Sequence, residues 1–172
     1  ANTGNDMSYD ATVKINPAFG TEILSGLNLY LGAHTAERRK NVVSLADAYE
    51  GVGAFTFDLG PVSLGGMVSG LYTGDETTSA TFHSYKNTGF GIAFNVNDDF
   101  SVSYGEYKSR KAGFAHTETT TQGTRFVEAS SFQAAYTMGG ATISIADVNI
   151  DNAGFAAAND QVATIVSLGL AF

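Results

Sequence analysis

The stretch that decides the fold is residues 161–172, QVATIVSLGLAF, in which apolar side chains recur at every second position. Successive side chains of an extended strand point to opposite sides. One side of this strand therefore carries the apolar residues Val166, Leu168, Leu170 and Phe172. The other side carries mostly small residues, namely Ala163, Ser167, Gly169 and Ala171, with Ile165 as the exception. This pattern is typical of a membrane β-strand, with lipid on one side and a crowded or watery interior on the other.

The composition limits how this chain can enter a membrane. Hydrophobic residues make up 44% of the sequence, yet no apolar run approaches the ~20 residues of a membrane helix. A closed barrel is the other structure that satisfies every backbone polar group in lipid. Twenty glycines and two prolines suit extended strands with small interior residues. A soluble sandwich that ends on a strand is the alternative interpretation.

Charge and cysteine content argue against several other classes of protein. Nine basic and seventeen acidic residues give a net charge of -8, which argues against a nucleic-acid binder. The same charge is compatible with a pore that mildly favours cations. Cysteine is absent, so we expect no disulfide framework and no thiolate metal site. We expect no cofactor either.

Period-two alternation recurs along the chain and predicts an all-β, antiparallel fold of about nine strands. The clearest case is residues 7–16, where apolar side chains alternate strictly with polar ones. The predicted strands are residues 7–16, 23–34, 47–59, 62–73, 86–96, 100–110, 126–138, 141–150 and 161–172.

The connections between these strands alternate in length. Short turns are predicted at residues 16–20, 60–61, 97–99 and 139–140. Longer polar loops are predicted at residues 35–46, 74–85, 111–125 and 151–160. Outer-membrane barrels have short periplasmic turns and longer extracellular loops, so the pattern predicts a transmembrane antiparallel β-barrel with residue 172 at the periplasmic side.

The number of strands conflicts with a complete barrel. Single-chain bacterial barrels have even strand numbers, whereas nine strands place the first residues on the extracellular side. The opening ANTGND is also polar, unlike a secretory leader, so we expect a processed chain or a part of a longer one. We favour the C-terminal part of a 16-stranded barrel, which needs on the order of 300 residues. The alternative is a small eight-stranded barrel with a structural or adhesive role. In that barrel residues 7–16 are not a barrel strand, and the other eight predicted strands close the barrel.

Two stretches carry a resemblance to a known family. Residues 136–152, YTMGGATISIADVNIDN, followed by a Gly- and Ala-rich loop and VATIVSLGLAF, resemble the end of the general porins of alphaproteobacteria. The final strand also resembles the last strand of Gram-negative outer-membrane barrels in general. The likeness covers mainly the last forty or so residues, and it includes no recognisable constriction-loop motif.

The resemblance implies a location, a function and several partners. The location is the bacterial outer membrane, and the function is a water-filled channel for passive diffusion of small hydrophilic solutes. The partners are outer-membrane lipid and lipopolysaccharide, the barrel-assembly machinery, and two further copies in a homotrimer. The last strand would present the assembly signal, which comprises Val166, Leu168, Leu170 and Phe172.

The alternation also predicts which polar groups face the interior. Six residues lie opposite lipid-type side chains: Asp10, Lys14, Asn28, Asn87, Asn95 and Gln133. In a wide barrel they would line a channel, and in a narrow barrel they would form a hydrogen-bonded plug. Lys108 and Arg110 have the parity of lipid-facing residues. They join the pore-lining candidates if a bulge at Gly105 turns them inward, and otherwise they stand above the membrane.

Two further predictions concern aromatic residues and catalysis. Aromatic girdles form at the ends of membrane strands, and the candidates here are Tyr49, Tyr72, Tyr107, Phe126 and Tyr136. The three histidines accompany no HExxH or GxSxG motif. A solvated cluster of Asp75, Glu76 and His83 is favoured over an acid–base site, so we expect no enzymatic activity.

Overall fold

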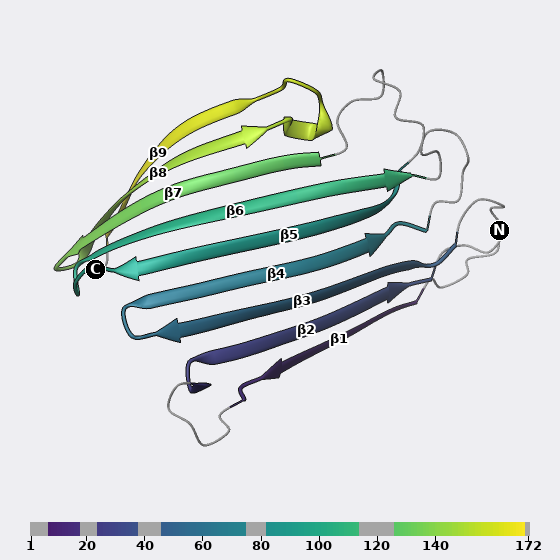
Figure 1. Cartoon of the computed structure of the whole chain (residues 1–172), viewed down its shortest axis with the longest axis horizontal. Coiled ribbons are helices and arrows are strands. Elements are labelled where there is room, and N and C mark those ends of the chain that lie inside the picture. Colours follow the sequence, from purple (N-terminus) through teal and green to yellow (C-terminus); the bar gives the residue numbers. More distant parts are fainter. Residues whose placement is uncertain (1–6, 18–23, 38–45, 75–81, 114–125, 171–172) are drawn as a thin grey trace.

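The computed structural model describes residues 7–17, 24–37, 46–74, 82–113 and 126–170. These residues form one antiparallel sheet in which each strand pairs with the next along the chain (Figure 1). The strands are β1 (Ser8–Ile15), β2 (Leu27–Ala36), β3 (Ala48–Leu59), β4 (Val62–Tyr72), β5 (Phe82–Asn95), β6 (Phe100–Gly113), β7 (Phe126–Met138), β8 (Ala141–Asp151) and β9 (Gln161–Leu170). A 3-10 turn, η2 (Ala153–Phe155), precedes β9. The predicted all-β antiparallel fold is confirmed.

The strand limits differ from the sequence prediction mainly at β2 and β5. β2 begins at Leu27, so its connection from β1 runs from Asn16 to Gly26 and is longer than the predicted turn. Gly26 lies beside the end of β3, where the Asp58 amide donates to the Gly26 carbonyl at 3.1 Å. A Cβ at Gly26 would overlap the Asp58 carbonyl, so the close approach requires glycine. β5 begins earlier than predicted, with a register shift between Phe82 and Ser84.

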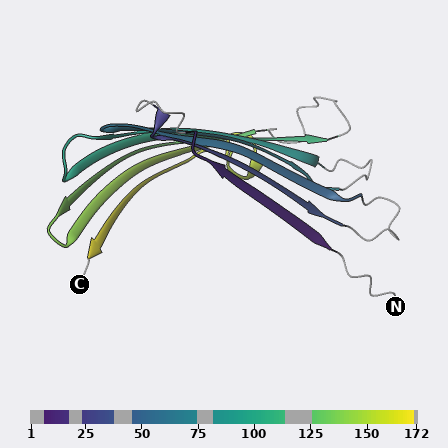
Figure 2. The same ribbon diagram turned by 90° about the horizontal axis from the view of Figure 1, so that it is seen from below.

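The sheet is strongly bowed (Figure 2). Its two faces differ in the exposure of their side chains. Along β2, β5 and β8, exposed side chains alternate with half-buried ones. The half-buried set includes Asn28, Asn87 and Ser144, and the exposed set includes Leu31 and Phe90. Because side chains crowd on the inner side of a curved sheet, the half-buried set defines the concave face. The exposed set defines the convex face.

The described residues contain almost no hydrophobic core. Ala48, at 7% exposure, is their only buried hydrophobic residue. Large apolar side chains are instead exposed on the convex face, from Leu31 on β2 to Leu168 on β9. Within the described ranges no helix has the length and hydropathy needed to cross a membrane. The large apolar side chains are thus mostly gathered on one exposed face and are not buried together.

The strand directions restrict how the sheet can be completed. All eight neighbouring pairs are antiparallel, so β1 and β9 run in the same direction. Both run toward the end that holds the β3–β4, β5–β6 and β7–β8 hairpins, here called the turn end; the opposite end is the loop end. Neither strand has a partner on its outer side within the described residues. Direct pairing of β9 with β1 would be parallel, so an all-antiparallel closure requires an odd number of further strands.

Candidate functional site

The concave face gathers six of the eight predicted pore-lining residues. The register places Asp10, Lys14, Asn28, Asn87, Asn95 and Gln133 on this one face, from β1 to β7. Their concave-face neighbours are mainly glycine, alanine, serine and threonine. Small neighbours leave these polar groups accessible, although the same face also carries apolar side chains such as Val52, Met67 and Val148.

Hydrogen bonds connect these groups across the strands. The Asn87 Nδ2 donates to the Ser69 hydroxyl at 3.0 Å, and the Ser109 hydroxyl donates to the Asn87 Oδ1 at 2.7 Å. These three side chains lie in register on β4, β5 and β6. Nearer the turn end, the Asn28 Nδ2 donates to the Thr56 hydroxyl at 3.4 Å. The concave face is therefore organised in polar rows that run across the sheet.

The charged groups of the concave face lie in two regions of the sheet. On β1 to β3, Asp10, His34 and Glu50 occupy one row, and the Asp10 carboxylate contacts the His34 Nδ1 at 2.6 Å. Lys14 lies nearer the turn end, with its ammonium group 5.5 Å from the centre of the Tyr30 ring. The other region is around Lys111 on β6. The carboxylates and ammonium groups thus stand apart on a curved surface, which allows both to be solvated.

Lys108 and Arg110 lie on the opposite, convex face. The register of β6 runs without a shift through Gly105, which pairs with Gly91 on one side and Ser131 on the other. The predicted inward-turning bulge at Gly105 is therefore wrong. Lys108 and Arg110 keep the parity of Tyr104, and they do not share the surface of the other six candidates.

The convex face of β1 to β4 is apolar from the turn end to the loop end. The described strands carry no charged side chain there. At its loop end the Tyr49 and Tyr72 rings stack with centroids 6.5 Å apart. Phe126 and Tyr136 also lie on the convex face, at the two ends of β7. Tyr107 is the exception, because its register with Gly89 and Ala129 places it within the concave face.

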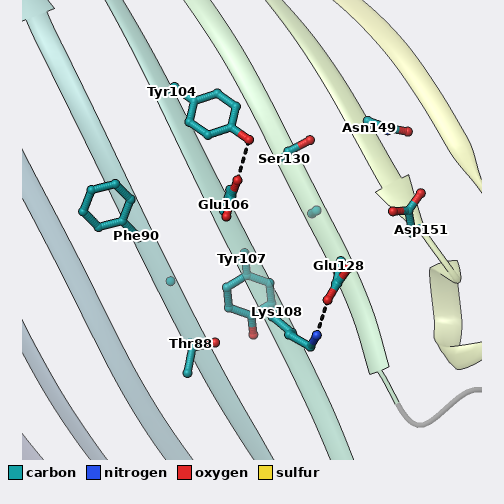
Figure 3. A pocket seen from close by; sticks show the side chains of 12 residues that line it. Thr88, Phe90, Tyr104, Glu106, Tyr107, Lys108, Glu128, Ser130, Asn149 and Asp151 are labelled. Carbon is teal, nitrogen blue, oxygen red and sulfur yellow. Dashed lines mark hydrogen bonds and ion pairs between the residues drawn. The ribbon is translucent and has the colours of Figure 1, made fainter.

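The convex face of β5 to β8 is charged toward the loop end (Figure 3). Lys108 forms an ion pair with Glu128 on β7, and its ammonium group lies 4.6 Å from the centre of the Phe126 ring. The Tyr104 hydroxyl donates to the Glu106 carboxylate at 2.6 Å. A hollow of about 420 Å³ lies in this region, and its lining includes Tyr104, Glu106, Lys108, Glu128, Asn149 and Asp151.

The β8–β9 connection folds over the concave face, which the sequence did not reveal. The Phe155 ring lies 6.0 Å from the Tyr85 ring of β5, and the Lys111 ammonium group lies 4.6 Å from the Phe155 centroid. Three non-glycine residues of the connection, Asn152, Phe155 and Ala158, have positive φ. The sequence prediction placed Tyr85 and Lys111 in loops, whereas the structure places them on β5 and β6. The sequence therefore indicated neither their inward orientation nor the path of the connection.

The polar side chains at the two ends of this connection form hydrogen bonds within the connection itself. The Asp160 carboxylate accepts the Asn152 amide at 3.0 Å, and the Asn159 Nδ2 donates to the Ala153 carbonyl at 3.0 Å. The Asn152 side chain accepts the Ala158 amide at 3.3 Å. These bonds give the connection a defined shape despite its unusual backbone angles.

Three residues of the predicted assembly signal lie together on the convex face of the edge strand β9. Val166, Leu168 and Leu170 are 69%, 62% and 56% exposed, and they continue the apolar surface of Ile143 and Ile145 on β8. Phe172 lies outside the described residues. The role of these residues as an assembly signal stays a prediction.

Comparison of the chain with protein-family models and with curated proteins finds no match.

Proposed function

We propose that this chain forms part of an outer-membrane channel of the porin type. The channel is a water-filled β-barrel in the bacterial outer membrane, and it passes small hydrophilic solutes and ions by diffusion. The described sheet forms one part of the barrel wall, with the concave face toward the channel and the convex face outward. The single observation that carries this proposal is the separation of exposed apolar and polar surfaces between the two faces.

The apolar surface of β1 to β4 supports a lipid-facing orientation. In water, its exposed leucine, valine and phenylalanine side chains would be an aggregation hazard. Each such side chain gains ~1.5–3 kcal/mol when it is fully transferred from water to an apolar environment. A lipid bilayer supplies that environment without a protein core, and a tyrosine pair at the loop end suits the membrane interface.

The concave face supports a wet interior. Among the described strands it carries three carboxylates, Asp10, Glu50 and Asp58, and two lysines, Lys14 and Lys111. Charges of both signs remain ionised only if water or close partners solvate them. The small surplus of carboxylates matches a weak preference for cations.

The sheet edges fit a barrel of even strand number. Seven further strands would satisfy the odd number required between β9 and β1 and would give the sixteen strands of the family that the sequence resembles. In this proposal the barrel assembles in lipopolysaccharide-containing membrane through its C-terminal strand.

The experiment is the electrical conductance of the full-length protein in a planar bilayer. We expect stepwise, ohmic currents with a modest preference for potassium over chloride, which weakens toward molar salt as charges are screened. Asp10→Lys should shift the reversal potential toward anions, because the residue faces water. Asp151→Lys, on the convex face, is the matched control and should shift it less. A folded, inserted protein that carries no current would overturn the proposal.

A further inference from the structure

Aromatic rings lie on the concave face of β5 and β6 and in the connection that covers them. The Tyr85 ring of β5 lies 6.0 Å from the Phe155 ring of the β8–β9 connection. Tyr107 of β6 is 41% exposed, and its neighbours in the register, Gly89 and Ala129, are small. Ring faces in a wet surface offer stacking positions for a flat solute. The concave face is therefore more than a set of polar and charged groups.

A polar row separates the Tyr85 ring from the Tyr107 ring. It consists of Ser69, Asn87 and Ser109, which lie in register on β4, β5 and β6. The Asn87 amide donates to the Ser69 hydroxyl at 3.0 Å and accepts from the Ser109 hydroxyl at 2.7 Å. A side-chain amide has two N–H groups and two oxygen lone pairs, so one of each remains beyond these two bonds. Asn87 can therefore donate to a solute and accept from it at the same time.

The spacing of these groups along β5 limits the size of the solute. Tyr85 and Asn87 are two residues apart, and Gly89, which pairs with Tyr107, follows two residues later. At ~3.3 Å per residue, the levels of Tyr85 and Tyr107 are about 13 Å apart. The surface thus presents a ring, an amide and a second ring over a length that two linked sugar rings can span.

The charges around the rings argue against ionic solutes. The Lys111 ammonium group lies 4.6 Å from the Phe155 centroid and would repel an organic cation at that ring. The surplus of carboxylates on the same face disfavours an organic anion. A purely apolar solute would displace water from the Asn87 amide without replacing its hydrogen bonds. A neutral solute that combines flat faces with hydroxyl groups avoids all three costs.

Saccharides have this combination. A sugar ring carries C–H groups on its faces, which suit the negative faces of aromatic rings. Its hydroxyl groups lie around the edge, where they both donate and accept hydrogen bonds. We infer that Tyr85, Asn87, Tyr107 and Phe155 form a binding site for a neutral saccharide on the channel wall. The inference rests on the proposed channel and names one class of solute for it.

The first experiment records the current through the full-length protein in a planar bilayer while maltose, a neutral disaccharide, is added. We expect brief interruptions of the current, and the blocked fraction should saturate as the maltose concentration rises. Sorbitol, which carries its hydroxyl groups on an open chain without a ring face, is the control solute. It should lower the current only as far as it lowers the conductivity of the bulk solution.

Substitutions at Tyr107 test whether its ring takes part. Tyr107→Ala should raise the half-saturating maltose concentration about threefold to tenfold, as expected for the loss of one ring contact. Tyr107→Phe keeps the ring and should keep the wild-type concentration. Tyr30→Ala is the matched control, because Tyr30 is another concave tyrosine but lies on β2 beside Lys14. It should leave the dependence on maltose unchanged.

A binding measurement keeps the site and the channel apart. Saturation-transfer NMR of maltose with the full-length protein in detergent micelles should show transfer to the sugar ring protons. Tyr107→Ala should weaken this transfer, and Tyr107→Phe should retain it. Protein that binds maltose in this way but carries no current would remove the channel alone.

Three results would overturn the saccharide site while an ohmic current left the channel standing. The first is a block by maltose that is no larger than that by sorbitol. The second is a block that rises linearly with maltose and never saturates. The third is an equal effect of Tyr107→Ala and Tyr30→Ala on the maltose dependence.

Discussion

The two halves of the sheet use the same alternation for different purposes. On β1 to β4, the convex face is apolar over its full length, and the concave face carries the polar row of Asp10 and His34. On β5 to β8, the convex face turns from apolar to charged halfway along the strands. There the concave face holds Tyr85 beneath Phe155. Toward the loop end of these strands, the convex face is charged and the concave face carries an aromatic contact.

Residues with the same strand parity therefore do not all share the same environment. Strand alternation determines which side chains share a face, but the chemistry of that face changes from strand to strand across the sheet and along each strand. The convex face of β1 to β4 is apolar throughout, whereas toward the loop end of β5 to β8 the convex face is charged and the concave face is covered by a folded connection.

The largest expected effect comes from placing a charge on the apolar half. Leu31→Arg, in the middle of β2, should lower the free energy of unfolding in lipid by ~2–4 kcal/mol. Thr88→Arg, on the convex face of β5 next to Lys108, should lower it by less than ~1 kcal/mol, as expected for one unfavourable cross-strand pair. Denaturant titration of both variants measures the difference. Equal losses would show that the two halves share one environment.

The folded connection offers a second, smaller test. Phe155→Ala removes the ring contact with Tyr85, which should cost ~0.5–1.5 kcal/mol of stability beyond the buried area. It should also raise single-channel conductance, because the connection then holds less firmly to the concave face. Ala157→Ser, an exposed position in the same connection, serves as the control. Unchanged conductance in Phe155→Ala would mean that this contact does not narrow the channel.

The smallest expected effect concerns the ion pair on the convex face. In a hydrated or protein-covered region, Glu128→Gln should cost less than ~1 kcal/mol of stability, as for other accessible ion pairs. If lipid covered Lys108, loss of its partner would leave a desolvated charge and cost ~3–5 kcal/mol. Glu50→Gln on the concave face provides the comparison. Thermal or denaturant unfolding of the inserted protein distinguishes the two ranges.

Much of the fold was predictable because a period of two determines faces directly. The alternation in residues 141–150 and 161–172 predicted which side chains β8 and β9 share on the convex face, and the structure agrees. The charged residues after Tyr104 interrupt the apolar series on the convex side of β6. The sequence alone could not decide whether a bulge at Gly105 turns them inward or whether they stay on that side in different surroundings. That choice depends on the register with β5 and β7, which pair without a shift at Gly105.

The contact of Phe155 was beyond prediction for a different reason. It joins residues far apart in the chain through a connection with positive φ at Asn152, Phe155 and Ala158. Asparagine tolerates this conformation, but phenylalanine and alanine adopt it only when the surrounding structure holds them there. The backbone preferences of the individual residues therefore did not indicate the path of the β8–β9 connection.

The central claim, that one face of this sheet lines water and the other does not, is tested most directly by cysteine scanning along β5. Single cysteines would be placed on the concave face at Asn87, Gly91 and Ala93, and on the convex face at Phe90, Ile92 and Phe94. A small charged thiol reagent in the aqueous phase is added while conductance is recorded. We expect the current to change at the three concave positions and to stay constant at the three convex ones. Modification without this alternation, or an alternation of opposite phase, would contradict the account.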